Sequence, residues 1–160
     1  NRQALVTVSE ELQQVQAYTE IEEARFPDRF DISFDIEADL NMILIPPFLI
    51  QILVENAIHH AFKDREVQNE IRVSLKRLST EEAIFCVQDN GFGIEESTLH
   101  QLGKQVIKSE LGSGTALENL SRRLQGIYGS QSDLQFKTSD EGTLISVRIK
   151  TFESEDEWLQ

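Results

Sequence analysis

The sequence predicts an α+β sandwich rather than a doubly wound α/β fold. Segments that alternate apolar and polar residues, typical of half-buried strands, occur between segments with helical spacing of apolar residues. Several predicted strands follow one another across short polar turns, which favours antiparallel hairpins over strand–helix–strand repeats. With 160 residues, of which 39% are hydrophobic, the chain is long enough to bury one core.

The first predicted element is an amphipathic helix that ends near Pro27. Thr7 and Glu10 have the spacing of a capping box, and no glycine or proline interrupts the chain from there to Phe26. Apolar residues recur along it in steps of three: Leu12, Val15, Tyr18 and Ile21. This spacing predicts a helix with one apolar face.

Two short strands are predicted next, over 31–36 and 41–45, followed by a helix from Pro46 through Ala61. Proline is tolerated in the first turn of a helix. Apolar residues cover about half of its helical wheel: Leu49, Ile50, Leu53, Val54, Ala57, Ile58 and Ala61. The other half carries Glu55, Asn56 and His59. We therefore expect this helix to bury one side and to present a carboxylate, an amide and an imidazole on the other.

The rest of the chain is predicted to contain two hairpins and one helix. The strands of the hairpins cover 71–78, 82–88, 134–138 and 143–150. Helical spacing of leucines predicts a helix over 115–128. The acidic residues from 153 onward are predicted to form a frayed tail.

The charge of the chain is unevenly distributed. The net charge is −13, which argues against a nucleic-acid or anionic-membrane surface as partner. Residues 46–152, however, carry 12 basic and 14 acidic side chains, whereas residues 1–45 carry 3 and 10. The central part is thus nearly neutral, and its charge is compatible with a small polyanionic ligand.

Five of the eight glycines fall within residues 91–114. Four of the five lie in two clusters, DNGFGI at 89–94 and GSGTAL at 112–117, and the second leads into a predicted helix. Glycine allows the backbone to approach a ligand closely, and the first turn of a helix offers free N–H groups to an anion. The two clusters are consistent with an anion cradle, and equally with a turn followed by a glycine-rich helix start.

Several common sites are excluded by their motifs. The sixth position of the second cluster is Leu117, so the dinucleotide fingerprint G-x-G-x-x-G fails, and no P-loop motif occurs. His59 and His60 are adjacent and thus about 100° apart on a helix, which does not suit zinc. The single cysteine, Cys86, stands in an apolar strand and is predicted to be a buried structural thiol.

The three polar and glycine-rich segments resemble the nucleotide-binding boxes of histidine-kinase catalytic domains. LVENAIHH at 53–60 resembles the N box, 89–94 the G1 box and 112–117 the G2 box. The resemblance implies the Bergerat fold of the GHKL ATPases, a two-layer sandwich in which a mixed sheet packs against helices. It covers about residues 5–152.

Residues around the boxes resemble the LytS-like subfamily of sensor histidine kinases. They are PFLIQ at 47–51, LEN at 117–119, RL at 123–124 and YG at 128–129. The helix before Pro27 resembles the linker helix of that subfamily. The implied organisation is a linker helix at 1–26, which ends the dimerisation region, an ATP-binding catalytic domain at 27–152, and an acidic tail at 153–160.

The resemblance implies ATP and Mg²⁺ as cofactors and gives several residues a role. Asn56 matches the Mg²⁺ ligand, Glu55 the general base, and Asp89 the acceptor for the adenine amino group. Further matched positions are expected around the nucleotide: His59, Gly91, Gly93, Ile94, Gly112, Gly114, Thr115 and Leu117.

Two positions depart from the family pattern. His59 stands where the family often has a lysine near the phosphates, and because histidine is largely neutral at pH 7 its electrostatic contribution is expected to be weaker. Ala116 replaces the usual third glycine of the G2 box. We expect an altered affinity rather than a loss of binding.

The implied function is that of a protein-histidine kinase in a two-component system. The domain would transfer the γ-phosphoryl group of ATP to a histidine upstream of this chain, for relay to a response regulator. The implied setting is the cytoplasmic domain of a membrane-anchored bacterial sensor, homodimeric through its phosphoacceptor helices, with no nucleic-acid partner. Two alternatives remain: a GHKL-type ATP hydrolase, and a degenerate nucleotide-dependent interaction module without kinase activity.

Overall fold

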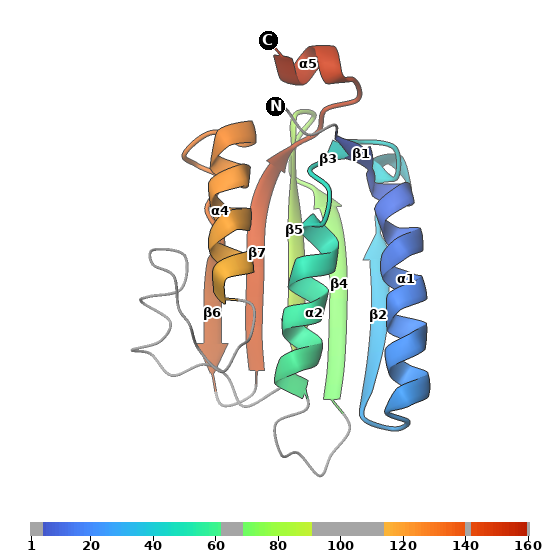
Figure 1. Ribbon diagram of the computed structural model, residues 1–160. Coiled ribbons are helices and arrows are strands. Elements are labelled where there is room, and N and C mark those ends of the chain that lie inside the picture. The colour runs from blue at the N-terminus through green and yellow to red at the C-terminus, as the bar shows by residue number, and fades with distance from the viewer. Residues whose placement is uncertain (1–4, 62–68, 91–113, 140–141, 160) are drawn as a thin grey trace.

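Five strands form one sheet, and three helices cover one of its faces (Figure 1). The computed structural model describes residues 5–61, 69–90, 114–139 and 142–159. The strands are, in sheet order, β2 (Phe30–Ile36), β4 (Asn69–Arg77), β5 (Glu82–Asp89), β7 (Gly142–Lys150) and β6 (Gln135–Ser139). β2 runs parallel to β4 and the other pairs are antiparallel, so the sheet is mixed. The predicted α+β sandwich is confirmed.

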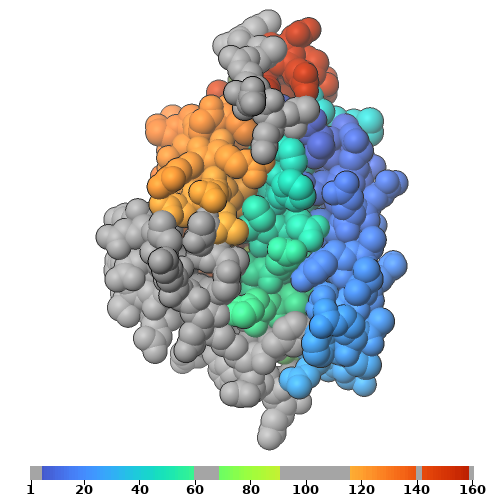
Figure 2. Space-filling view, in the orientation of Figure 1, coloured from blue at the N-terminus to red at the C-terminus, as the bar shows by residue number. Residues whose placement is uncertain are grey.

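The helical layer consists of α1 (Val8–Arg25), α2 (Leu49–Ala61) and α4 (Gly114–Tyr128). Figure 2 shows them side by side, with α2 in the middle. The capping box is present, since Thr7 Oγ1 accepts from the Glu10 N–H at 3.1 Å and the Glu10 carboxylate accepts from the Thr7 N–H at 3.2 Å. Within the described ranges, no helix is long and apolar enough to cross a lipid bilayer.

The core lies between the sheet and the helices. On β4, β5 and β7, every second side chain is buried toward the helices: Ile71, Val73, Leu75, Ala83, Phe85, Val87, Ile145, Val147 and Ile149. Each large apolar side chain buried in this way contributes about 1.5–3 kcal/mol. The same alternation turns Cys86 to the opposite face of the sheet, where it is only partly buried. The prediction of a buried thiol is therefore wrong.

Two elements differ from the predictions near the start of α2. The strand predicted over 41–45 is reduced to β3 (Leu44–Ile45), which pairs with β1 (Val6–Thr7), because a 3₁₀ turn, η1 (Ala38–Leu40), occupies the chain just before it. α2 begins at Leu49 rather than at Pro46. The residue before a proline disfavours the helical conformation, and Phe48 has a φ of +72°, which lies outside the right-handed helical region.

The acidic C-terminal residues also differ from the prediction. Instead of a frayed tail, they form a short helix, α5 (Glu155–Leu159). The side chain of Glu157 accepts a hydrogen bond from the Glu153 N–H at 3.2 Å. Carboxylates in the first turn of a helix are favoured by its dipole, which accounts for a helix in so acidic a segment.

Candidate functional site

Three elements with predicted site residues end at the same edge of the molecule. The C-terminal half of α2 lies toward the lower end of Figure 1, and the N-terminus of α4 points in the same direction. α2 contacts both β5 and α4. Segments that are separated in the sequence by about 25 residues or more are therefore brought together around α2.

α2 supplies one exposed and one buried polar group. Glu55 is exposed, and its Oε1 accepts a hydrogen bond from Gln51 Nε2 at 3.0 Å. Asn56 is only 2% exposed. We expected Asn56 on the polar side of the helix, but it is seven residues from the buried Leu49 and so shares its face. The amide is thus turned inward, where burial restricts its orientation.

The neighbourhood of Glu55 also includes a residue of α1. Burial, together with the nearby carboxylates of Glu22 and Glu55, raises the pKa of Tyr18 to about 12. Glu22 in turn pairs with Arg25 at 3.2 Å. His59, one turn beyond Glu55, is exposed. The outer side of α2 therefore carries Glu55 and His59, with α1 groups close to Glu55.

Asp89 is the last residue of β5 and is 8% exposed. Val87, two residues earlier, belongs to the core on the helical side, and strand alternation places Asp89 on that same side. Its Cα partners in the sheet are Ile71 on β4 and Thr143 on β7. A buried carboxylate at the end of a central strand can accept hydrogen bonds from a ligand with a defined direction.

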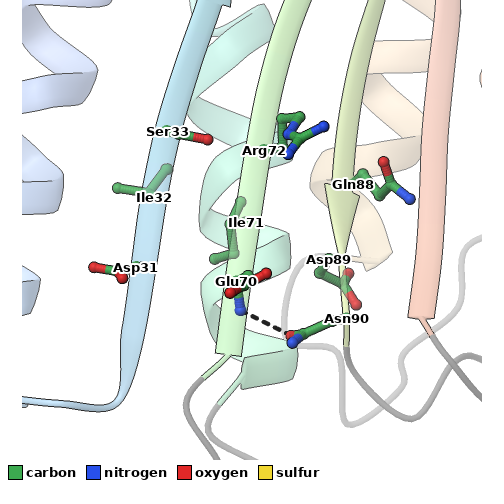
Figure 3. A pocket seen from close by; sticks show the side chains of 9 residues that line it. All are labelled: Asp31, Ile32, Ser33, Glu70, Ile71, Arg72, Gln88, Asp89 and Asn90. Atoms are coloured by element: carbon green, nitrogen blue, oxygen red, sulfur yellow. Dashed lines mark hydrogen bonds between the residues drawn. The ribbon is translucent and has the colours of Figure 1, made fainter.

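Asn90 holds the end of β5 in place. Its Oδ1 accepts a hydrogen bond from the Glu70 N–H at 2.8 Å, and its own N–H donates to the Glu70 carbonyl at 3.2 Å (Figure 3). An open hollow of about 570 Å³ lies at this end of the sheet, and Figure 3 shows the side chains of the residues that line it. Charged residues of both signs line this hollow: Asp31, Glu70, Arg72 and Asp89. The hollow therefore includes the end of β5.

Two residues at the start of β7 approach Asp89 and were missed by the sequence reasoning. A Cβ added at Gly142 would lie 1.9 Å from the Asp89 carbonyl oxygen, and Gly142 has a φ of +144°. Thr143 is 2% exposed, and its Oγ1 is 3.2 Å from Thr138 Oγ1. The sequence placed Gly142 in a hairpin turn. The register of β5 against β7 pairs its neighbour Thr143 with Asp89, and Gly142 lies against the Asp89 carbonyl.

The glycine-rich segments are described only in part. Gly114 is the first residue of α4 and Thr115 lies in its first turn. Leu117 is fully buried in the hydrophobic core. Its expected contact with the nucleotide stays a prediction. Gly91, Gly93, Ile94 and Gly112 lie outside the described residues.

A comparison with known families decides what kind of site this is. The sequence model of the histidine kinase-, DNA gyrase B- and HSP90-like ATPases matches residues 47–153, which include α2, β5, α4 and β7. The chain belongs to this ATPase family. The matched residues contain each of the described elements that converge on the candidate site.

Relatives of this ATPase domain are sensor proteins. The sensor protein LytS of Staphylococcus saprophyticus is 45% identical over 159 residues, which are 99% of this chain and 27% of that protein. The sensor histidine kinase/phosphatase LytS of Staphylococcus aureus is 46% identical over 143 residues, 89% of this chain and 24% of that protein. The chain thus spans about a quarter of these relatives, and it is a LytS-like histidine-kinase ATPase domain.

Solved structures confirm the fold. The catalytic domain of histidine kinase ThkA superposes with a TM-score of 0.71 at 12% identity, covering 96% of this chain and 98% of that one. The ThkA kinase in complex with the response regulator protein TrrA gives a TM-score of 0.64 at 14% identity, covering 94% of this chain and 42% of that one. The two-layer sandwich is therefore that of histidine-kinase catalytic domains.

The ATPase domain offers oxygen donors that suit Mg²⁺. This ion prefers hard oxygen ligands, and at nucleotide sites it is held by one or two protein groups together with phosphates and water. The amide oxygen of Asn56 fits that pattern. The described residues contain no group of three or more histidine, cysteine or acidic side chains that could hold a metal ion alone.

Proposed function

We propose that this domain binds ATP with Mg²⁺ between α2, the end of β5 and the N-terminus of α4, and transfers the γ-phosphoryl group to a histidine elsewhere in its parent protein. The observation that carries the proposal is the pair Asn56 and Asp89. Both are polar and almost fully buried, and they come from two elements that contact each other, α2 and β5. A few buried polar side chains from different elements are typical of a site that binds a polar ligand.

Each of these residues would bind a different part of the Mg²⁺-bound nucleotide. Asp89 would accept a hydrogen bond from the adenine amino group. The N–H groups of the first turn of α4, at Gly114 and Thr115, would face the phosphates, which the positive end of the helix dipole favours. Asn56 would hold Mg²⁺, which supplies neutralisation of phosphate charge.

Glu55 is placed for a different task from that of Asn56. It is exposed, so that an imidazole of another segment can reach it, and Gln51 restricts its orientation through the 3.0 Å hydrogen bond. We infer that it accepts the proton from the acceptor imidazole as the N–P bond forms and the bond between the γ-phosphorus and the bridging oxygen breaks, with ADP leaving. General-base catalysis of this kind contributes about 10²–10⁴-fold to a rate.

The names of the relatives support a proposal for the wider role. We propose that the acceptor histidine lies on dimerisation helices of the parent protein, that α1 connects to those helices, and that the phosphoryl group passes to a response regulator. The parent would be a membrane-anchored sensor with this domain on its cytoplasmic side. Val8, Leu12 and Val15 of α1 belong to the core of the domain, so the connection would be rigid.

Calorimetric titration with a non-hydrolysable ATP analogue and Mg²⁺ tests the binding step. Asp89→Asn is expected to weaken binding about tenfold to a hundredfold, since a hydrogen bond to a charged group contributes about 1.5–3 kcal/mol. Asn56→Asp is expected to weaken only the Mg²⁺-dependent part. Asp31→Asn, an exposed change on the other face of the sheet, serves as the matched control. No binding by the unaltered domain would refute the proposal and leave a degenerate interaction module.

The transfer step needs a separate assay. With γ-labelled ATP, the domain alone is expected to acquire no acid-labile label, whereas a phosphoacceptor fragment of the parent protein supplied in trans is expected to be labelled. Rapid release of inorganic phosphate without labelling of that fragment would instead favour an ATP hydrolase.

A further inference from the structure

The turn that precedes α2 cannot cap the helix with its own groups. Pro46 and Pro47 have no N–H, and Phe48 adopts a φ of +72°. The Leu49 N–H donates to the Pro46 carbonyl at 3.3 Å, and the Ile52 N–H donates to the Phe48 carbonyl at 2.9 Å. This leaves the N–H groups of 48, 50 and 51 in need of acceptors at a helix end that packs into the protein.

A side chain from α1 provides those acceptors. Glu11, 3% exposed, accepts from the Phe48 N–H through Oε1 and from the Ile50 N–H through Oε2, the latter at 2.5 Å. Burial raises the pKa of this carboxyl, and its interactions with the backbone of the turn act against that shift. One buried carboxylate thus caps the N-terminus of a helix almost 40 residues away, where the positive end of the helix dipole favours a negative charge.

A side chain from α4 binds the same turn from the other side. Arg123 Nη2 donates to the Pro47 carbonyl at 2.6 Å. Burial raises the pKa of Glu11 and lowers that of Arg123, while the attraction between the two opposite charges acts against both shifts. The first turn of α2 is therefore held between an acid from α1 and a base from α4, and we call this pair the α2 clamp.

We propose that Glu11 and Arg123 are positioning residues of the nucleotide site, which act by fixing α2 along its axis and so placing Asn56 and Glu55. Neither residue is expected to touch the nucleotide. The inference rests on the proposed function of this site. A helix is a stiff rod with a rise of about 1.5 Å per residue, so a shift of its first turn is transmitted to Asn56, seven residues on.

The clamp acts first as a cap. Buried Glu11 and half-buried Arg123 each hydrogen-bond to the backbone of the turn before α2. At the position of Glu11 an apolar side chain would leave the Phe48 and Ile50 N–H groups without acceptors. The clamp therefore specifies the position of α2 as well as its cap, and the residues of α2 that need a defined position are those of the nucleotide site.

The test compares two affinities of one ATP analogue, with Mg²⁺ and with a chelator. Glu11→Gln keeps the size of the side chain and removes its charge. In this variant the ratio of the affinity with Mg²⁺ to the affinity without it is expected to fall about tenfold or more. Substitution of residues that orient metal ligands has an effect of this size at other metal sites. The affinity without Mg²⁺, which depends on Asp89, is expected to stay within twofold. Glu23→Gln, an exposed change on the same helix, is the matched control.

Arg123→Gln is a second test variant, and it too is expected to weaken binding with Mg²⁺ but not binding without it. Arg122→Gln, an exposed change one residue away, is its control. Equal loss of both affinities, or no loss in either, would overturn the inference. If the unaltered domain does not bind the analogue at all, the proposed function fails instead. Amide hydrogen exchange then tests separately whether Glu11 fixes the position of α2. In Glu11→Gln, protection should fall along α2 as far as His59. A fall confined to residues 48–51 would reduce Glu11 to a local cap.

Discussion

Gly142 lies so close to Asp89 that no side chain fits between them. A Cβ at position 142 would be 1.9 Å from the Asp89 carbonyl oxygen and 2.9 Å from the Asn90 Cα. The start of β7 therefore sets the position of the buried carboxylate at the end of β5.

Gly142→Ala is predicted to weaken nucleotide binding and to destabilise the domain. The added methyl must displace the backbone of Asp89, and the φ of +144° is itself unfavourable for alanine. We expect the free energy of unfolding, measured by urea denaturation, to fall by about 1–3 kcal/mol. A variant with the stability and the analogue affinity of the unaltered domain would contradict the assigned contact.

Gly126→Ala is the same substitution at a second glycine, and it is predicted to stabilise the domain. Gly126 lies inside α4, and nothing is within 4 Å of the position of an added Cβ. Alanine in a helix interior is favoured over glycine by about 0.5–1 kcal/mol. The melting temperature should rise by a few degrees, about 2–4 °C per kcal/mol for a domain of this size. A fall in the melting temperature would mean that α4 is packed differently from the structure.

The two tyrosines are predicted to make the domain sensitive to alkali. Burial is the main cause that raises the pKa of Tyr18 to about 12 and that of Tyr128 above its ordinary range. Unfolded tyrosine ionises near pH 10, so between about pH 10 and pH 12 the unfolded state loses its protons first and stability falls as the pH rises. Tyr18→Phe should reduce this fall, which thermal melts from about pH 9 to pH 11 would measure. An unchanged slope would contradict the shifted pKa of Tyr18.

Glu55→Gln is predicted to separate binding from transfer. Because Glu55 is exposed and distinct from the buried Asn56, the change should leave the affinity for the Mg²⁺-bound analogue within about threefold. Phosphorylation of an acceptor fragment in trans should fall by about 10²–10⁴-fold. Glu20→Gln, an exposed change on α1, is the control. Unchanged transfer by Glu55→Gln would remove Glu55 from the role of base.

The sequence was sufficient for the elements whose signals are local. Periodic apolar spacing, the capping box at Thr7 and the polar turn between β4 and β5 each lie within one segment, and the structure has them where they were predicted. The boxes likewise pointed to Glu55, Asn56 and Asp89 by their own residues. Their placement at one end of the helical layer required the fold.

The contacts that hold the site together could not be predicted in this way. In the sequence, Glu11 is one of several acidic residues on the first predicted helix. The backbone N–H groups that donate to it are almost 40 residues away. Gly142 and Thr143 read as a hairpin end until the register of β7 against β5 is known. The inward turn of Asn56 depends on how α2 is rotated against its neighbours, which the wheel alone does not determine. In each case the decisive information is a long-range pairing.

The position of β2 sets a limit on how far the domain can be shortened. β4 lies between β2 and β5, so a chain reduced to residues 47–153, the part matched by the family, would expose seven register positions of β4, Asn69 to Leu75, as an open edge. Such an edge is a template for aggregation. That shortened chain would also lack Glu11 and the apolar face of α1. The smallest unit able to fold independently therefore begins at or before Thr7, the cap of α1, which lies 46 residues ahead of the first nucleotide-binding box at 53–60.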